Sequence, residues 1–127
     1  MAILDLDFSD VVEPRTVEAD KEYKLRITDV KEGTNKNGEP YLMPRFEILD
    51  EVGAKDFTKY LGLPSASMDA KKMNNTKYGL KLFLEAFGLP AASEPSDWVG
   101  AEGWAILGVE ENDQYGAQNF VKKFVKS

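Results

Sequence analysis

Residues 22–30 read Glu-Tyr-Lys-Leu-Arg-Ile-Thr-Asp-Val, and this stretch decides the predicted fold class. Apolar and polar residues alternate along it. Successive side chains of an extended strand point to opposite faces, so the alternation predicts a β-strand with one buried face. The expected buried face holds Tyr23, Leu25 and Ile27, and the expected solvent face holds Lys24 and Arg26.

Four more strands are predicted from similar signals. They cover Tyr41 to Leu49, Lys55 to Leu61, Gly103 to Glu110 and Ala117 to Val125. Asn37-Gly38 indicates a hairpin turn between the first two strands. In the second strand, Leu42, Phe46 and Ile48 share the expected buried face, and Pro44 indicates an edge position or a bulge. Which face of the third strand is buried stays open, because apolar residues occur at both odd and even positions of this segment.

A helix is predicted between the third and fourth strands. Leu80, Phe83, Leu84 and Phe87 recur at helical spacing. A loop is expected from Pro64 to Asn75, with Asn74 or Asn75 as the N-cap and Gly88 just past the helix end. Gly79 falls inside the helix, where glycine costs about 1 kcal/mol relative to alanine.

This element order predicts a mainly β fold. Five short strands with one α-helix between strands 3 and 4 is the layout of the OB-fold barrel, in which the helix closes one end. The alternative is another small sheet with a helix on one face. We expect an acidic N-terminal arm over residues 1–20 and the OB-fold domain over residues 21–127.

Composition excludes several classes of protein. The 127 residues contain no Cys and no His, which removes disulfides, the usual zinc ligands and imidazole bases. Paired carboxylates such as Asp50-Glu51 lie in predicted turns and diverge, so we expect no enzyme, no cofactor and no catalytic or metal site. No apolar run is long enough to span a membrane, and no targeting segment is apparent.

The net charge of −6 by itself argues against binding a polyanion. The first 20 residues, however, hold six acids and one base, so the rest of the chain is almost neutral. Within the arm, Leu4, Leu6 and Phe8 alternate with polar residues, which predicts a short strand. The segment from Lys55 to Lys81 holds six bases and two acids, and its charge suggests a cationic side.

Basic and aromatic residues interleave on the predicted strands, as in proteins that bind single-stranded nucleic acid. The candidate cations are Lys24, Arg26, Lys36, Arg45, Lys59, Lys122 and Lys123, and the candidate stacking rings are Tyr41, Phe57, Tyr60, Trp104 and Tyr115. For Phe57 a core position is an equally open reading, and for Trp104 a core position is slightly favoured. Lys24 and Arg26 alone would also fit an ordinary solvated face.

Several motifs resemble the small single-stranded DNA-binding proteins of bacteriophages. The resemblance lies in Glu22-Tyr-Lys-Leu-Arg-Ile, Lys36-Asn-Gly-Glu-Pro-Tyr, Arg45-Phe-Glu-Ile-Leu-Asp, Leu84-Glu-Ala-Phe-Gly-Leu, Val99-Gly-Ala-Glu-Gly and Tyr115-Gly-Ala-Gln-Asn-Phe-Val-Lys-Lys-Phe. It implies an OB-type barrel that binds single-stranded DNA in phage replication, recombination or repair. It adds Asn119 to the candidate site and implies the cytoplasm of an infected bacterial host.

The resemblance also bears on partners. Replicative single-strand binders often recruit replication or recombination proteins through an acidic C-terminal tail, whereas this chain ends in Lys122-Lys-Phe-Val-Lys-Ser. Its acids lie in the N-terminal arm instead, which we expect to serve recruitment or homo-oligomer formation. No membrane partner is expected. The alternative function is a non-catalytic protein–protein interaction module, and a carboxylate-dependent nuclease is the third reading.

Overall fold

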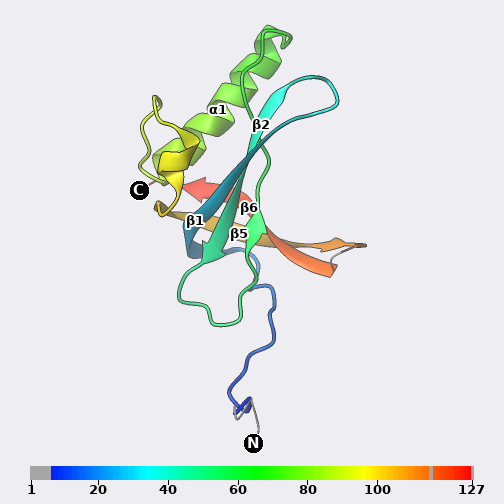
Figure 1. Cartoon of the computed structure of the whole chain (residues 1–127), viewed down its shortest axis with the longest axis vertical. Coiled ribbons are helices and arrows are strands. Elements are labelled where there is room, and N and C mark those ends of the chain that lie inside the picture. The colour runs from blue at the N-terminus through cyan, green and yellow to red at the C-terminus, as the bar shows by residue number, and fades with distance from the viewer. Residues whose placement is uncertain (1–6, 115, 127) are drawn as a thin grey trace, which may run out of the picture.

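Strand β1 (Lys21–Thr34) is the centre of the sheet in the computed structural model, which describes residues 7–114 and 116–126 (Figure 1). The first half of β1 pairs with β5 (Glu102–Asn112), and the second half pairs with β2 (Pro40–Ile48). The changeover occurs at Leu25, whose partners are Ile48 on one side and Gly103 on the other. A register shift follows between Ile27 and Asp29, and such a bulge increases local twist.

The described residues form one six-stranded antiparallel sheet of order β3-β2-β1-β5-β6, with β4 also paired to β2. The remaining elements are β3 (Phe57–Thr58), β4 (Leu61–Gly62), helix α1 (Ala70–Ala86), the short helix η1 (Pro95–Trp98) and β6 (Gly116–Val125). The β1–β2 and β5–β6 hairpins project in different directions in Figure 1, so the sheet is curled into a half-barrel.

The predicted third strand is present as two short strands, β3 and β4, interrupted at Lys59 and Tyr60. The predicted count of five strands was therefore wrong, because the sheet has six. Pro44 explains where the break falls. The Pro44 carbonyl accepts a hydrogen bond from the Lys59 amide at 3.1 Å. The Pro44 nitrogen faces the same edge of β2 but has no hydrogen to donate, so the pairing is interrupted opposite Lys59.

The helix begins earlier than the sequence predicted. Ala70 is its first residue, and Asp69 caps it by accepting a hydrogen bond from the Lys72 amide at 2.7 Å. Asn74 and Asn75 consequently lie inside the helix, and the N-cap lies about one and a half turns earlier than expected. The prediction for Gly88 is confirmed, since it follows the helix with a φ of 63°, a conformation that glycine adopts without strain.

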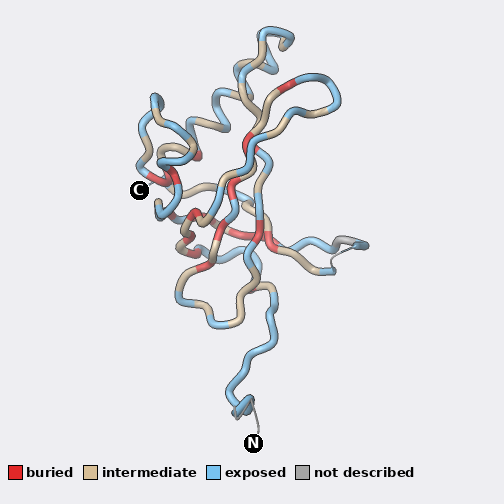
Figure 2. Tube along the Cα trace, in the orientation of Figure 1, coloured by how far each residue is buried: buried red, intermediate tan, exposed pale blue. Residues whose placement is uncertain are grey.

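The core is built from the faces that the alternation predicted. Tyr23, Leu25 and Ile27 of β1 are buried, as are Leu42, Phe46 and Ile48 of β2. Figure 2 shows buried residues concentrated where the strands meet, while residues 7–15 and most of the two hairpin tips are exposed. From α1, Phe83 and Phe87 are buried and pack 5.1 Å apart, whereas Leu80 and Leu84 are only partly buried.

Phe57 belongs to this core and is not a stacking surface. Its side chain is 4% exposed, and its ring lies 5.4 Å from that of Phe46. Trp98 is also buried, with its ring 5.2 Å from that of Phe83. The facing of the predicted third strand, left open by its sequence, is thereby settled for Phe57, which is the first residue of β3.

The chain from Arg15 to Asp20 packs against the body. The Arg15 amide donates to the Gly53 carbonyl at 2.8 Å, and Val17 is buried in the core. The strand predicted around Leu4 and Leu6 lies outside the described residues. Phe8, from the same pattern, is 65% exposed and not in a strand.

The described part of the chain contains no helix long and apolar enough to cross a membrane.

Two glycine-to-alanine changes are expected to shift stability in opposite directions. A Cβ atom on Gly103 would lie 2.5 Å from the Ala86 carbonyl oxygen, so Gly103→Ala should destabilise the fold by about 1–3 kcal/mol. A Cβ atom on Gly79 would meet nothing within 4 Å, so Gly79→Ala should stabilise it by about 1 kcal/mol. Urea unfolding of both variants measures this, and the same sign for both would contradict the packing described.

Candidate nucleic-acid interface

The cations predicted on the outer face of the sheet are there, but carboxylates neutralise them. Glu102 of β5 lies 3.1 Å from Lys24 Nζ through one oxygen and 3.1 Å from Arg26 through the other. Glu47 of β2 lies 3.7 Å from Arg26. These side chains are about one third to two fifths exposed, so each pair contributes little to stability, on the order of 1 kcal/mol or less.

The outer face is therefore close to neutral. Lys24 and Arg26 hold the pKa of Glu102 below its usual range, because both donate hydrogen bonds to its carboxylate. Arg45 is paired in the same way, with its Nε 3.4 Å from Asp56. A polyanion on this face would have to displace these carboxylates. The sequence analysis missed this because the partners of Lys24 and Arg26 come from distant strands.

The predicted rings fall into different surroundings. Trp104 is not in the core: it is 41% exposed on β5, directly opposite Lys24 of β1. Tyr41 and Tyr60 form a pair with ring centroids 4.7 Å apart, and Tyr60 is 48% exposed. Tyr115 lies outside the described residues.

A second surface brings together the remaining candidates. A groove of about 350 Å³ lies between β4, α1 and β6, where the two ends of the curled sheet approach each other; we call it the seam groove. Lys55, just before β3, spans the same gap further along by donating to the Ala117 carbonyl at 3.4 Å. The lining residues are Lys59, Tyr60, Leu61, Gly62, Asn75, Thr76, Gly79, Leu80, Leu82, Val121, Lys122, Lys123 and Phe124.

The seam groove is cationic, since its lining contains three lysines and no carboxylate. Lys123 is exposed and, among the described residues, has no carboxylate partner. Lys122 is ion-paired with Asp20. Lys59 is only partly exposed, its ammonium 5.9 Å from the centroid of the Phe124 ring, and burial lowers the pKa of its amine.

Rings and small residues complete the groove. Phe124 and Tyr60 are both lining residues, and Gly79 leaves part of the α1 wall without a side chain. Tyr78, which the sequence analysis did not single out, is 58% exposed on α1. It lies at i+3 from Asn75 and i−4 from Leu82, so it borders the groove-lining face of the helix.

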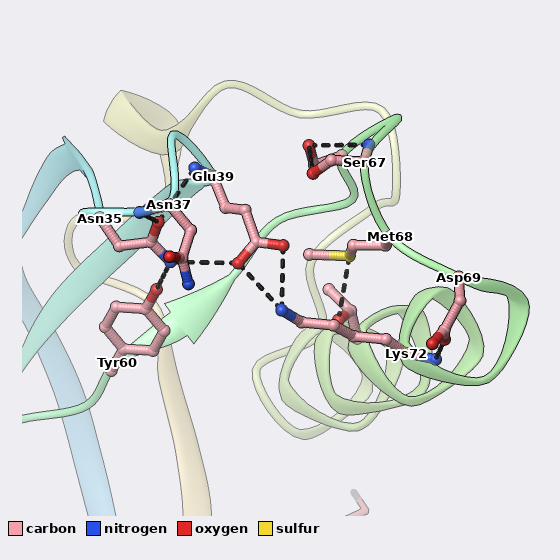
Figure 3. Close-up of polar contacts among 10 residues, drawn as sticks. Asn35, Asn37, Glu39, Tyr60, Ser67, Met68, Asp69 and Lys72 are labelled. Carbon is pink, nitrogen blue, oxygen red and sulfur yellow. Dashed lines mark hydrogen bonds and ion pairs between the residues drawn. The ribbon is translucent and has the colours of Figure 1, made fainter.

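A polar network orients Tyr60 and joins the β1–β2 hairpin to α1 (Figure 3). Asn35 donates through Nδ2 to the Tyr60 hydroxyl and to Glu39 Oε1, at 3.2 Å each. Glu39 also accepts from Lys72 Nζ at 2.9 and 3.0 Å. These two donors hold the pKa of Glu39 below its usual range, with Lys72 contributing more. Lys72 thus serves the fold rather than a ligand.

Two other predicted site residues lie outside both surfaces. Lys36 is exposed in the turn between β1 and β2. Asn119 is only 4% exposed and cannot reach a ligand. Its Oδ1 accepts from the Val17 amide at 2.9 Å, while its Nδ2 donates to the carbonyls of Val17 and Gly108. Asn119 therefore anchors the chain that precedes β1.

Comparison with models of known protein families and with curated protein sequences finds no match for this chain. Within residues 7–114 and 116–126, no group of three or more Asp or Glu residues could hold a metal ion.

Asn119→Ala is expected to lower the free energy of unfolding by about 2–3 kcal/mol, because it leaves buried backbone groups of Val17 and Gly108 without partners. Thermal or urea unfolding measures the change. The neighbouring Gln118→Ala serves as a control and should stay within about 0.5 kcal/mol of the parent. If Asn119→Ala leaves the stability unchanged but weakens DNA binding, Asn119 contacts DNA and the anchoring role is wrong.

Proposed function

We propose that this protein binds single-stranded DNA without sequence preference, and that the strand lies in the seam groove. The observation that carries the proposal is the convergence of Lys59, Lys122 and Lys123 with Tyr60 and Phe124 around a groove whose lining has no carboxylate. Phosphate-tracking cations beside exposed rings are the two components of single-strand recognition. The proposed activity is non-catalytic.

The fold supports this proposal. If β3 and β4 are counted as one interrupted strand, the order is three strands, a helix and two strands, which is the order of an OB-type barrel. We propose that the curled half-barrel is of this type. OB barrels commonly bind oligonucleotides across one face of the sheet and its neighbouring loops.

The choice of the groove over the outer face follows from charge. Each phosphate that a lysine neutralises releases a counterion, which favours binding at low salt. On the outer face, Lys24, Arg26 and Arg45 already contact carboxylates, so this gain is offset. Among the groove lysines, Lys122 alone has a carboxylate partner in the part of the chain that the structure describes. Stacking adds about 1–3 kcal/mol for each base, so Tyr60 and Phe124 matter as much as the lysines.

A biological setting is proposed from the sequence motifs. A protein of this kind would protect single-stranded DNA during phage replication, recombination or repair in the cytoplasm of the infected cell. It would work beside replication or recombination proteins.

A second candidate function is a protein–protein interaction module. It is favoured by the neutral outer face, where the exposed ring of Trp104 lies beside ion-paired residues. Titration with a labelled oligo-dT separates the two candidates: binding at low salt supports the first, and a flat titration supports the second.

Gly79→Glu is expected to weaken oligo-dT binding roughly ten-fold, because it adds a carboxylate to the groove lining at a position where a Cβ atom meets nothing within 4 Å. Gly79→Ala is the matched control and should bind within about two-fold of the parent. Fluorescence anisotropy at several salt concentrations measures both. Equal binding by the two variants would exclude the groove as the DNA site.

A pair of charge-removing variants tests which surface is used. Asp20→Asn frees Lys122 and should tighten binding several-fold, steepening the log–log salt slope by about 0.7. Asn tolerates the positive φ of 65° at this position. Glu102→Gln frees Lys24 and Arg26 on the outer face and should change binding less than about two-fold. A large effect of Glu102→Gln with little effect of Asp20→Asn would instead indicate that DNA binds the outer face.

A further inference from the structure

The N-terminal arm has chemical features that match the seam groove. Among the described residues before Pro14, the acids Asp7, Asp10 and Glu13 occur with no base. The apolar residues Phe8 and Val11 are both 65% exposed in this segment. The segment therefore presents apolar and anionic groups together, which is the chemistry that complements a surface both apolar and cationic.

The seam groove offers the complementary chemistry. Lys59, Lys122 and Lys123 supply positive charge, and the 36%-exposed Leu82 and the Phe124 ring supply an apolar surface. The structure already holds one contact of the required kind. Asp20, the last residue of the N-terminal arm, is ion-paired with the groove residue Lys122. An N-terminal carboxylate thus satisfies one groove lysine within the same chain.

Residues 7–13 of the arm are directed away from the groove of their own chain. The Arg15 amide donates to the Gly53 carbonyl, and the Lys55 amide donates to the Arg15 carbonyl at 2.9 Å, so the arm is fixed at Arg15 beside the turn before β3. Figure 1 shows residues 7–14 (blue) running off the end of the body that lies opposite α1. A second copy is therefore the better-placed partner for this arm.

We propose that residues 7–13 of one copy dock into the seam groove of a second copy, with Phe8 beside Leu82 and Phe124 and the carboxylates beside the three lysines. The groove is the one assigned to DNA in the proposed function, so arm and strand would compete for it. Self-association itself does not depend on DNA binding. Because the contact is largely electrostatic, it weakens as salt rises.

A complementation experiment tests the proposal without DNA. The groove variant Gly79→Glu keeps the arm, and the arm variant Asp7→Lys/Phe8→Ser/Asp10→Lys keeps the groove. Sedimentation velocity at low salt should show the parent self-associating, each variant alone as a monomer, and an equimolar mixture of the two forming a 1:1 complex. High salt should dissociate both the parent and the mixed complexes.

Two controls make the outcome decisive. Gly79→Ala should self-associate like the parent. So should Asp97→Lys/Val99→Ser/Asp113→Lys, which makes the same kinds of change away from the arm. Circular dichroism checks that every variant is folded.

A parent that stays monomeric, an arm variant that still self-associates, or a mixture that behaves as two monomers would each overturn the proposal. Complementation without oligo-dT binding would instead refute the proposed function and leave this inference standing.

Discussion

The close approach of helix α1 to strand β5 at Gly103 is the constraint on which the groove depends. Gly103 is paired with Leu25 at the point where β1 changes partner, and the Ala86 carbonyl lies where a side chain on Gly103 would be. Only glycine leaves room for this contact. It brings Phe83 and Phe87 into the core against Phe46, and it leaves the other flank of the helix as one wall of the seam groove.

The polar network around Glu39 fixes the β1–β2 hairpin against the N-terminal part of α1. Lys72 of α1 and Asn35 of the β1–β2 hairpin both donate to the Glu39 carboxylate, and Asn35 also donates to Tyr60. A carboxylate that accepts several hydrogen bonds is favoured in its charged form. The network therefore couples the position of the Tyr60 ring to the docking of the hairpin on the helix. A ring held in this way loses less conformational entropy when a base stacks on it.

Charge pairing rather than charge number distinguishes the two surfaces. The outer face has as many strand-borne cations as the groove has lysines, yet its cations contact Glu47, Asp56 and Glu102. The net charge of −6 likewise conceals a groove lined by three lysines and no acid. Local pairing rather than net charge therefore sets the electrostatic character of each surface, because exposed charges further apart than a Debye length of about 8–10 Å are largely screened.

The sequence by itself determined the strands, the helix and most of the core. Alternation over a few residues fixes which side chains of β1 and β2 share a face, and the helical spacing of Phe83 and Phe87 fixes the face that packs inward. These signals are local, so a single segment contains them. The break at Lys59 and the early helix start at Ala70 were missed because they depend on Pro44 in a neighbouring strand and on capping by Asp69.

Only the tertiary structure decided which candidate residues share a surface. Glu102 reaches Arg26 across 76 positions of sequence, and Asp20 reaches Lys122 across 102. The same folding buried Phe57 and Asn119, exposed Trp104, and brought Lys59 to Phe124. Period and composition describe neighbours along the chain, whereas the charge and accessibility of a site depend on groups that folding brings together through space.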